Sequence, residues 1–281
     1  MAEKKAAKTF DLSLPTEPVK AQLLEPKSLV IMGAPKIGKT TACALLPKAL
    51  VLNCEDKEQT TTGMIKYFDS YEMLVAILKH IRENPDKYNY MFGVVDTVTK
   101  LEALAEKRGE MIYARTLQGK NWIVIDKATG KLSPLCGKAK YRSILSLPKG
   151  AGYPYVTTAL REIKQMLEDT FPYVIYLAHT KETQMEDSAG EEITVTEINL
   201  TGKNKLMFAS EAQAIGRMQR MGKELYIQFQ PSDSVIAGNK IDRLDGTNIL
   251  VSKKKEDGTF ETHWEEIYNI ALRKQQVSKT K

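Results

Sequence analysis

The chain has 281 residues, a net charge of +6, 42% hydrophobic residues and 27% charged residues. These values are typical of a globular protein and exclude wholesale disorder, collagen and a small disulfide scaffold. Three scattered cysteines, Cys43, Cys54 and Cys136, favour neither a disulfide framework nor a zinc site and predict a reducing, cytoplasmic environment. No apolar run approaches the ~20 residues of a membrane span, so no membrane association is expected.

The predicted elements follow a polar, proline-containing segment, residues 1–27, which we interpret as a flexible arm. Apolar runs and amphipathic spacing predict, in chain order, a strand at 29–32, a helix at 40–46, a strand at 49–53, a helix through 74–81, a strand at 91–95, a helix at 97–115, a helix through 156–167 and a strand at 173–178. Asp69 and Glu72 form the capping box expected for the 74–81 helix.

The last third of the chain has a different pattern. Residues 214–221 and 224–230 predict an antiparallel hairpin, and residues 262–273 predict a closing helix with Thr262 and Glu265 as its capping box.

Together these patterns predict an α/β fold. Strands that are apolar throughout and alternate with helices indicate a mostly parallel central sheet with helices on both faces. The C-terminal strands add an antiparallel extension. We therefore expect a single domain at 28–274, with a basic insertion at 115–150 and a basic tail at 275–281.

The segment from Gly33 to Thr40 matches the pattern G-x-x-x-x-G-K-[ST], with a predicted strand before it and a helix after it. Glycines let backbone N–H groups curve around phosphate oxygens, and a helix N-terminus favours an anion. Lys39 is expected to contact the β- and γ-phosphates, and Thr40 to bind Mg²⁺. The motif predicts ATP and Mg²⁺ as ligands, with the nucleotide held by Gly33, Ala34, Pro35, Lys36, Ile37, Gly38, Lys39, Thr40 and Thr41.

Three polar side chains follow apolar strands and are candidates for the same site. Asp96 is expected to bind Mg²⁺ with Thr40, although an aspartate after a strand is by itself more often a helix N-cap. Glu55 is placed to polarise the attacking water, the alternative being a solvated acid beside Asp56. His179 is placed to sense the γ-phosphate, the alternative being an ordinary histidine at a strand end.

These segments resemble the core of RecA-type ATPases over residues 28–250. The resemblance rests on Gly33–Thr40, Leu52-Asn53-Cys54-Glu55, Val94-Val95-Asp96-Thr97 and Tyr176-Leu177-Ala178-His179. It implies ATP hydrolysis with Glu55, Lys39 and His179 as catalytic side chains, although the family usually has Gln at the place of His179. The chain is most similar to small phage-encoded RecA-like ATPases associated with single-strand annealing and recombination.

The resemblance also implies single-stranded DNA as a partner. Residues 115–149, here called the basic segment, hold eight basic residues and one acidic residue, a net charge of +7. They stand at the place of the family's first DNA loop. Lysines interleaved with aromatic rings suit unpaired bases, and the predicted DNA contacts are Lys120, Trp122, Lys138, Lys140, Tyr141 and Arg142. The alternative is a hairpin with a solvated basic face.

A second loop of the family corresponds to residues 180–193, here called the acidic segment. It has one basic residue and five acidic residues, a net charge of −4, so it is expected to contribute little to phosphate contact.

RecA-type sites usually lie between subunits, so the resemblance implies a ring or a filament. Lys240 and Arg243 are the candidates for the cation supplied to a neighbour's γ-phosphate, with Arg217 and Arg220 behind them. A single-strand-binding or annealing protein is a further expected partner, in the cytoplasm of a bacterial host.

Two other functions remain open. One is a nucleotide-switched ATPase with a KaiC-like core that acts on protein partners, and the other is a P-loop small-molecule kinase. The charge of the basic segment favours DNA over the first alternative. Glu55 favours an ATPase over the second.

Overall fold

The structure, a computed structural model, describes residues 14, 16–18, 22–58, 61–120, 123–125, 132–134, 143–186, 192–231 and 237–278. Its strands are β1 (Ser28–Gly33), β2 (Ala49–Asn53), β3 (Ile65–Tyr67), β4 (Phe92–Asp96), β5 (Ile123–Ile125), β6 (Leu132–Pro134), β7 (Tyr173–Glu186), β8 (Glu192–Ile198), β9 (Ala214–Met221), β10 (Glu224–Gln228), β11 (Gly238–Asn239), β12 (Asn248–Lys254) and β13 (Phe260–Thr262). Its helices are α1 (Lys39–Ala44), α2 (Tyr71–Glu83), α3 (Val98–Ala114), α4 (Tyr153–Glu168), α5 (Asn204–Glu211) and α6 (Asn269–Ser278).

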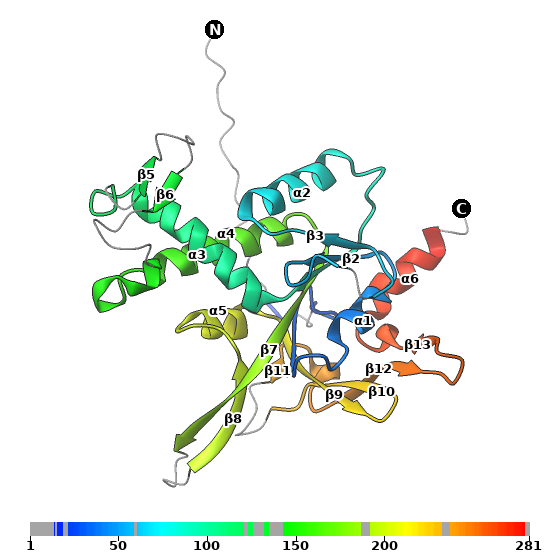
Figure 1. Cartoon of the computed structure of the whole chain (residues 1–281). Coiled ribbons are helices and arrows are strands. Elements are labelled where there is room, and N and C mark those ends of the chain that lie inside the picture. Colours follow the sequence, from blue (N-terminus) through cyan, green and yellow to red (C-terminus); the bar gives the residue numbers. More distant parts are fainter. Residues whose placement is uncertain are drawn as a thin grey trace.

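One large sheet organises the fold, with the strand order β13-β12-β10-β9-β1-β7-β4-β2-β3 (Figure 1). Within this order, the pairs β3–β2, β2–β4, β4–β7, β7–β1 and β1–β9 are parallel. The pairs β9–β10, β10–β12 and β12–β13 are antiparallel. The predicted fold class is therefore confirmed: a mixed α/β fold with a mostly parallel sheet and antiparallel C-terminal strands.

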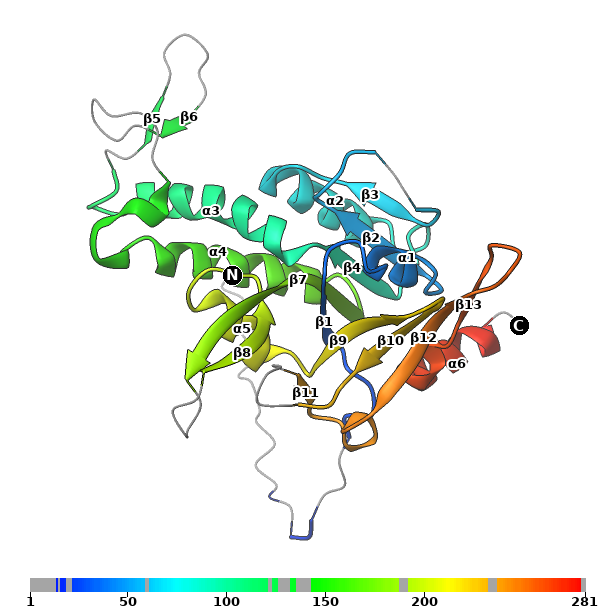
Figure 2. The ribbon, with the colours of Figure 1, turned by 60° about the horizontal axis from the view of Figure 1, so that its bottom comes forward.

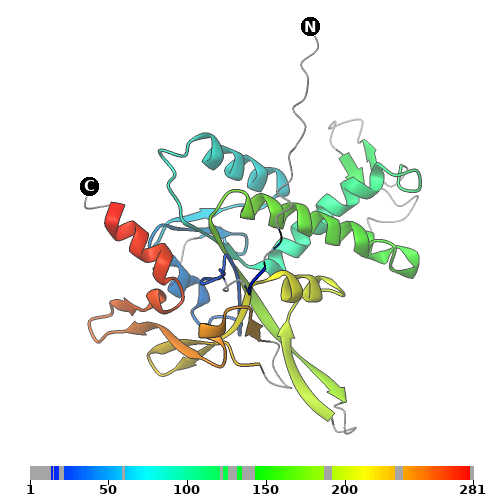
Figure 3. The same ribbon diagram turned by 180° about the vertical axis from the view of Figure 1, so that it is seen from behind.

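Side chains on the two faces of the central strands enter two separate cores. In β1, Val30 and Met32 pack with apolar residues of α2, α3, α4 and α5. Leu29 and Ile31 point to the other face and pack with residues of α1, α6 and the C-terminal strands. This alternation is the two-residue period of a strand buried on both faces. Figure 2 shows α3 and α4 running side by side over the face that contains Val30 and Met32, and in the view from behind in Figure 3 the two helices cross.

The helix through residues 74–81 forms as α2, but the predicted capping box is wrong. The N-cap is Ser70, whose Oγ accepts a hydrogen bond from the N–H of Met73 at 3.4 Å. Ser70 stands three residues before Met73, the spacing that lets a short hydroxyl reach an unpaired amide of the first turn. Asp69 lies one residue too early for that role.

The closing helix begins later than predicted. Residues 260–262 form β13, and α6 starts only at Asn269. Its first-turn amides are capped by Glu25, whose carboxylate accepts hydrogen bonds from the N–H groups of Ile270 and Ala271. The predicted capping box at Thr262 and Glu265 is therefore wrong. Glu25 is only 5% exposed, so the packed part of the chain includes residues within the predicted arm.

In the described part of the acidic segment, residues 180–186 and 192–193 form strands rather than a loop. Strand β7 continues past the predicted end at residue 178 and pairs antiparallel with β8, and the pair projects from the body of the molecule (Figure 1). In the basic segment, β5 and β6 pair antiparallel. In the part of the chain described, none of the helices has the length and hydropathy that crossing a membrane requires.

Candidate active site

The P-loop, Gly33–Thr40, connects the end of β1 to the start of α1. Two of its residues have left-handed backbone conformations, Lys36 with φ 62° and Gly38 with φ 114°. A Cβ atom at Gly38 would lie 2.7 Å from Nη2 of Arg220 and 3.0 Å from Cδ1 of Leu225. Only glycine satisfies both the conformation and the space at this position.

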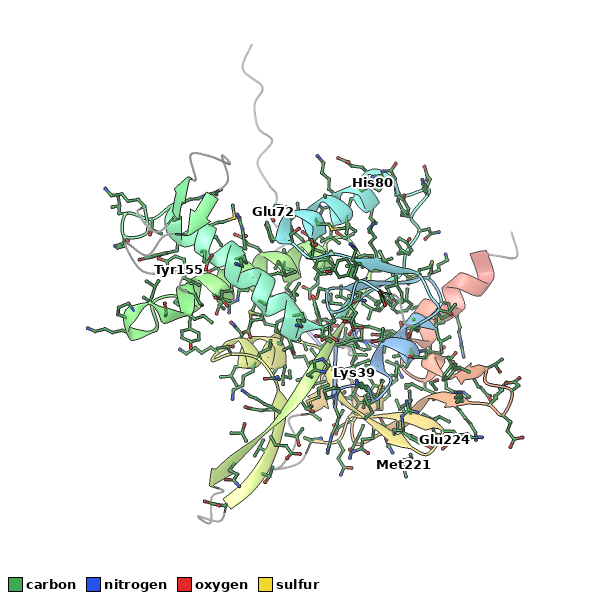
Figure 4. All side chains as sticks on the ribbon, viewed as in Figure 1. Lys39, Glu72, His80, Tyr155, Met221 and Glu224 are labelled. Atoms are coloured by element: carbon green, nitrogen blue, oxygen red, sulfur yellow. The ribbon has the colours of Figure 1, made fainter. Side chains whose placement is uncertain are left out.

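The side chain of Lys39 is folded back over the P-loop. Its Nζ donates hydrogen bonds to the carbonyl oxygens of Gly33 at 2.8 Å and Ala34 at 2.9 Å. Burial lowers the pKa of Lys39, while the charges of Asp96 and Glu55 act in the opposite direction. Lys39 is the first residue of α1 and is labelled in Figure 4.

Thr40 and Asp96 are in direct contact. The Thr40 hydroxyl donates a 2.5 Å hydrogen bond to Oδ2 of Asp96, the last residue of β4. Burial is the main cause that raises the pKa of Asp96, and the bond from Thr40 opposes it. A hydroxyl and a carboxylate side by side are the oxygen ligands that Mg²⁺ takes from proteins, together with waters and substrate phosphates.

Glu55 lies beside this pair and is held by two donors. Its Oε1 accepts hydrogen bonds from Oγ1 of Thr97 and Nε2 of His179, each at 2.8 Å. The backbone N–H of Glu55 donates to Oδ1 of Asn53 at 2.8 Å, which fixes the turn after β2. In the described part of the chain, Oε2 of Glu55 accepts no hydrogen bond.

Lys39, Thr40, Asp96, Glu55 and His179 all open into one cavity of about 220 Å³. It is lined by Lys36, Gly38, Lys39, Thr40, Thr41, Glu55, Asp56, Thr61, Asp96 and His179. The structure therefore brings together the predicted side chains of the P-loop, β2, β4 and β7. Thr97 was missed as a functional residue, although a hydroxyl directly after a strand-end aspartate is a signal that could have identified it.

The residues at this site fit a magnesium nucleotide. The glycine at position 38 leaves backbone room, the Lys39 ammonium is present beside it, and Thr40 and Asp96 supply two oxygens. Within the described ranges, no group of three or more His, Cys, Asp or Glu side chains is arranged around a possible metal. Mg²⁺ needs no such cluster, because it commonly uses one or two protein oxygens plus phosphates and water.

The predicted intersubunit cations have other contacts in this chain. Arg243 donates hydrogen bonds to the carbonyl oxygens of Leu24 at 2.9 Å and Glu266 at 2.6 Å, and to that of Ile267. Lys240 Nζ lies 3.5 Å from the carbonyl oxygen of Ser210. Neither residue lines the cavity, so their role toward a neighbouring subunit stays a prediction.

One of the six predicted DNA contacts lies in the described part of the chain. Lys120 is exposed after α3, whereas the others lie outside the described residues: Trp122, Lys138, Lys140, Tyr141 and Arg142.

A second cavity, here called the Tyr153 groove, lies between α4 and α5 and has a volume of about 830 Å³. Its apolar side chains include Tyr153, 37% exposed, and Leu206, 56% exposed. A Cβ atom at Gly150 or Gly202 would lie 3.4 Å from the Tyr153 ring, so both backbones pass close to it. The cations of the groove are Lys149, Arg161 and Lys203, and no carboxylate lines it in the described residues. No motif pointed to this groove.

Comparison with known proteins gives one family match. Residues 25–241 match the AAA domain family, AAA_24. Among solved structures, the crystal structure of the RadB recombinase is 11% identical, with a TM-score of 0.40, and the match covers 85% of this chain and 92% of that chain. No curated protein has a significant match to the sequence.

Proposed function

Because the chain belongs to the AAA domain family, AAA_24, we propose that it is a RecA-like ATPase that binds ATP with Mg²⁺, hydrolyses it and acts on single-stranded DNA. The observation that carries the proposal is the meeting of Lys39, the Thr40–Asp96 pair and Glu55 in one cavity. These are the parts that phosphoryl transfer to water requires: phosphate contacts, metal ligands and a base.

Binding rests on the P-loop and the two oxygen ligands. The backbone N–H groups of the P-loop and the Lys39 ammonium bind phosphate oxygens, and Thr40 and Asp96 hold the metal. When bound, Mg²⁺ neutralises charge that develops on the phosphates.

Hydrolysis rests on Glu55. Thr97 and His179 both donate to Oε1, which orients the carboxylate and leaves Oε2 available to accept a proton from water. Nε2 of His179 is the donor in this arrangement, and Nδ1 is buried without a partner in the described residues.

Single-stranded DNA is supported by the charge of the basic segment and by the Tyr153 groove. Lys149 and Lys203 form no ion pair with any described residue, whereas Arg161 pairs with Glu211 at 3.4 Å. A partly exposed tyrosine between unpaired lysines suits a base stacked on the ring with its phosphates beside it. We propose that the protein acts in the annealing, recombination or replication of phage DNA. An annealing or single-strand-binding protein is its proposed partner.

Self-association belongs to the same proposal. The only cations that line the active-site cavity in the described chain are Lys36 and Lys39, both from the P-loop. A neighbouring subunit in a ring or filament would add the missing cation to the γ-phosphate. Sedimentation with a slowly hydrolysed ATP analogue tests this step, because a strict monomer with full ATPase activity contradicts it.

The proposal as a whole is tested by ATP turnover of the purified chain with Mg²⁺, with and without single-stranded DNA. We expect magnesium-dependent hydrolysis that increases when the DNA is added. No hydrolysis under either condition overturns the ATPase assignment. Equal rates under both conditions, together with no DNA binding at low salt, overturn the DNA assignment.

A nucleotide-switched ATPase acting on a protein is the second candidate, and one observation favours it. An apolar cavity of about 690 Å³ lies against β3 and α2, lined in part by Met64, Met73, Ile77 and Tyr90. Methionine-rich apolar surfaces suit protein partners. This candidate becomes the preferred one if hydrolysis proves independent of DNA.

A further inference from the structure

Arg220 contacts the P-loop from outside the active-site cavity. It is the second-to-last residue of β9, the strand that pairs with β1, and its side chain is exposed. Its guanidinium donates two hydrogen bonds to the carbonyl oxygen of Ile37, from Nε at 3.1 Å and from Nη2 at 2.6 Å. Arg220 itself does not line the cavity, whereas Lys36, Gly38 and Lys39 do.

The contact fixes one peptide plane of the P-loop. The carbonyl of Ile37 and the N–H of Gly38 belong to the same peptide group. In a trans peptide these two bonds point in opposite directions. Because Arg220 holds the carbonyl oxygen on the side away from the cavity, the N–H of Gly38 is directed toward the cavity. That N–H is one of the backbone donors that a P-loop offers to phosphate.

The P-loop needs such a restraint here, because the residues on both sides of Ile37 have unusual backbone angles. Lys36 and Gly38 both have positive φ. Glycine reaches many backbone conformations at little cost, so the Ile37–Gly38 peptide is free to rotate unless something outside the loop holds it.

The β9–β10 hairpin supplies this restraint through two neighbouring side chains. Arg220 and Leu225 stand opposite each other in the antiparallel pair, so they lie on the same face of the hairpin. Both come closest to the place where Gly38 lacks a Cβ atom. The labelled residues Met221 and Glu224 mark the turn of this hairpin (Figure 4).

We propose that Arg220 is a positioning residue of its own subunit's nucleotide site: it locks the Ile37–Gly38 peptide so that the Gly38 N–H is oriented for phosphate before ATP binds. This differs from the role expected for the C-terminal arginines, which was to reach the γ-phosphate of a neighbouring subunit. The inference rests on the proposed nucleotide site and names a residue that the P-loop motif does not contain.

The test compares ATP affinity and turnover in Arg220→Gln, Arg220→Lys and a matched control. The control is Lys223→Gln, which removes one exposed positive charge from the turn of the same hairpin. We expect Arg220→Gln to raise the Kd for ATP about 10-fold and Arg220→Lys about 3-fold, since lysine keeps the charge and one donor. The value of kcat at saturating ATP stays within about 2-fold in both variants, because only loop ordering before binding is lost.

The control is expected to match the wild type in both Kd and kcat, and all variants are expected to have wild-type melting temperatures without nucleotide. If Arg220→Gln melts early, Arg220→Lys becomes the deciding variant. Wild-type ATP affinity in the deciding variant overturns the inference. A wild-type chain that binds no ATP overturns the proposed function instead, so the two failures are distinguishable.

A mixing experiment distinguishes whether Arg220 acts on the nucleotide site of its own subunit or on that of a neighbouring subunit. Arg220→Gln chains are mixed with Glu55→Gln chains at an ATP concentration below KM. If Arg220 acts within its own subunit, the mixture has only the summed activity of its two components. Activity well above that sum means that the Glu55→Gln chains supply Arg220 to their neighbours, and this result overturns the inference.

Discussion

Oε1 of Glu55 and Nε2 of His179 lie 2.8 Å apart and connect β2 to β7, two strands that are not adjacent in the sheet. Glu55 follows β2, His179 belongs to β7, and β4 lies between these strands in the sheet. The hydrogen bond passes over the end of β4, where Thr97 donates to the same oxygen. One carboxylate oxygen therefore connects the ends of β2 and β4 to the middle of β7, and the other oxygen accepts no hydrogen bond in the described residues.

The first prediction concerns Glu55 as the base. Glu55→Gln keeps the shape of the side chain but removes the proton acceptor, so we expect ATP to bind normally while kcat falls about 10²-fold or more. Equilibrium binding and single-turnover hydrolysis measure the two steps separately. The matched control is the neighbouring Asp56→Asn, expected to retain turnover. Near-normal hydrolysis in Glu55→Gln and a loss in Asp56→Asn would transfer the role to Asp56.

The second prediction concerns His179 as the residue that orients Glu55. His179→Ala removes one of the two donors to Oε1, so we expect kcat to fall about 10-fold while ATP affinity is retained, as for loss of a hydrogen bond to a charged group. His179→Gln keeps an N–H donor and is expected to recover most of that loss. Wild-type turnover in His179→Ala would show that Thr97 alone is sufficient to hold the carboxylate.

The third prediction follows from the buried carboxyl of Asp96. Burial raises its pKa in the folded chain above that in the unfolded chain. Its contribution to stability is therefore most favourable below the unfolded pKa, about 3.9, and is lost as pH rises through the folded pKa. Asp96→Asn carries no such charge, so we expect it to be more stable than the wild type at neutral pH, with the advantage shrinking on acidification.

Thermal unfolding in EDTA without nucleotide, at several pH values, measures the difference between Asp96→Asn and the wild type. The same substitution is expected to abolish magnesium-dependent ATP binding, because it removes a metal ligand. A variant that is less stable than the wild type at neutral pH would mean that the bond from Thr40 outweighs the cost of burial.

The fourth prediction concerns the cap on α6. Glu25→Ala leaves the N–H groups of Ile270 and Ala271 and the hydroxyl of Tyr173 without their acceptor. We expect a loss of about 2 kcal/mol in the free energy of unfolding, as for a buried helix cap. Urea unfolding measures it, and ATP affinity is the control that should not change. An unchanged midpoint would show that α6 is held by its apolar contacts alone.

The residues that meet in the active site were predictable because of a general property of parallel sheets. Gly33, Glu55 and Asp96 each stand at or after the carboxyl end of an apolar strand, and His179 stands where β7 stops pairing with β1. These positions meet at one edge of the parallel sheet. Their proximity did not depend on knowing the strand order. The bond between Glu55 and His179 did depend on it, since the sequence alone does not place β4 between β2 and β7.

Contacts between distant segments were not predictable. Glu25 and Ile270 are 245 positions apart, and Arg220 and Ile37 are 183 positions apart. In both cases a charged side chain satisfies backbone groups of another element. No local spacing encodes such a pair. The two expected capping boxes were wrong for different reasons. In α2 the cap is Ser70, the residue next to Asp69, whereas in α6 it is Glu25, which is distant in sequence.

The fifth prediction concerns the Tyr153 groove as a site for single-stranded DNA. Tyr153→Ala is expected to lose about 1–3 kcal/mol of DNA binding through lost stacking, with little change in salt dependence. Tyr153→Phe keeps the ring and is expected to bind like the wild type. Replacing Lys149 and Lys203 together by Gln removes two phosphate contacts, so the slope of log K against log salt should flatten by about 1.4.

Fluorescence titrations with a labelled oligonucleotide at several salt concentrations separate stacking from charge. Reversing Lys138, Lys140 and Arg142 to Glu tests the basic segment in the same assay and is expected to flatten the slope further. Glu192→Gln on the β7–β8 hairpin is the control, since an acidic arm adds no phosphate contact. If Tyr153→Ala, the double lysine variant and the triple reversal all bind DNA like the wild type, both basic surfaces are merely solvated. The apolar cavity beside β3 and α2 then becomes the better candidate for a binding surface, and a protein becomes the preferred partner.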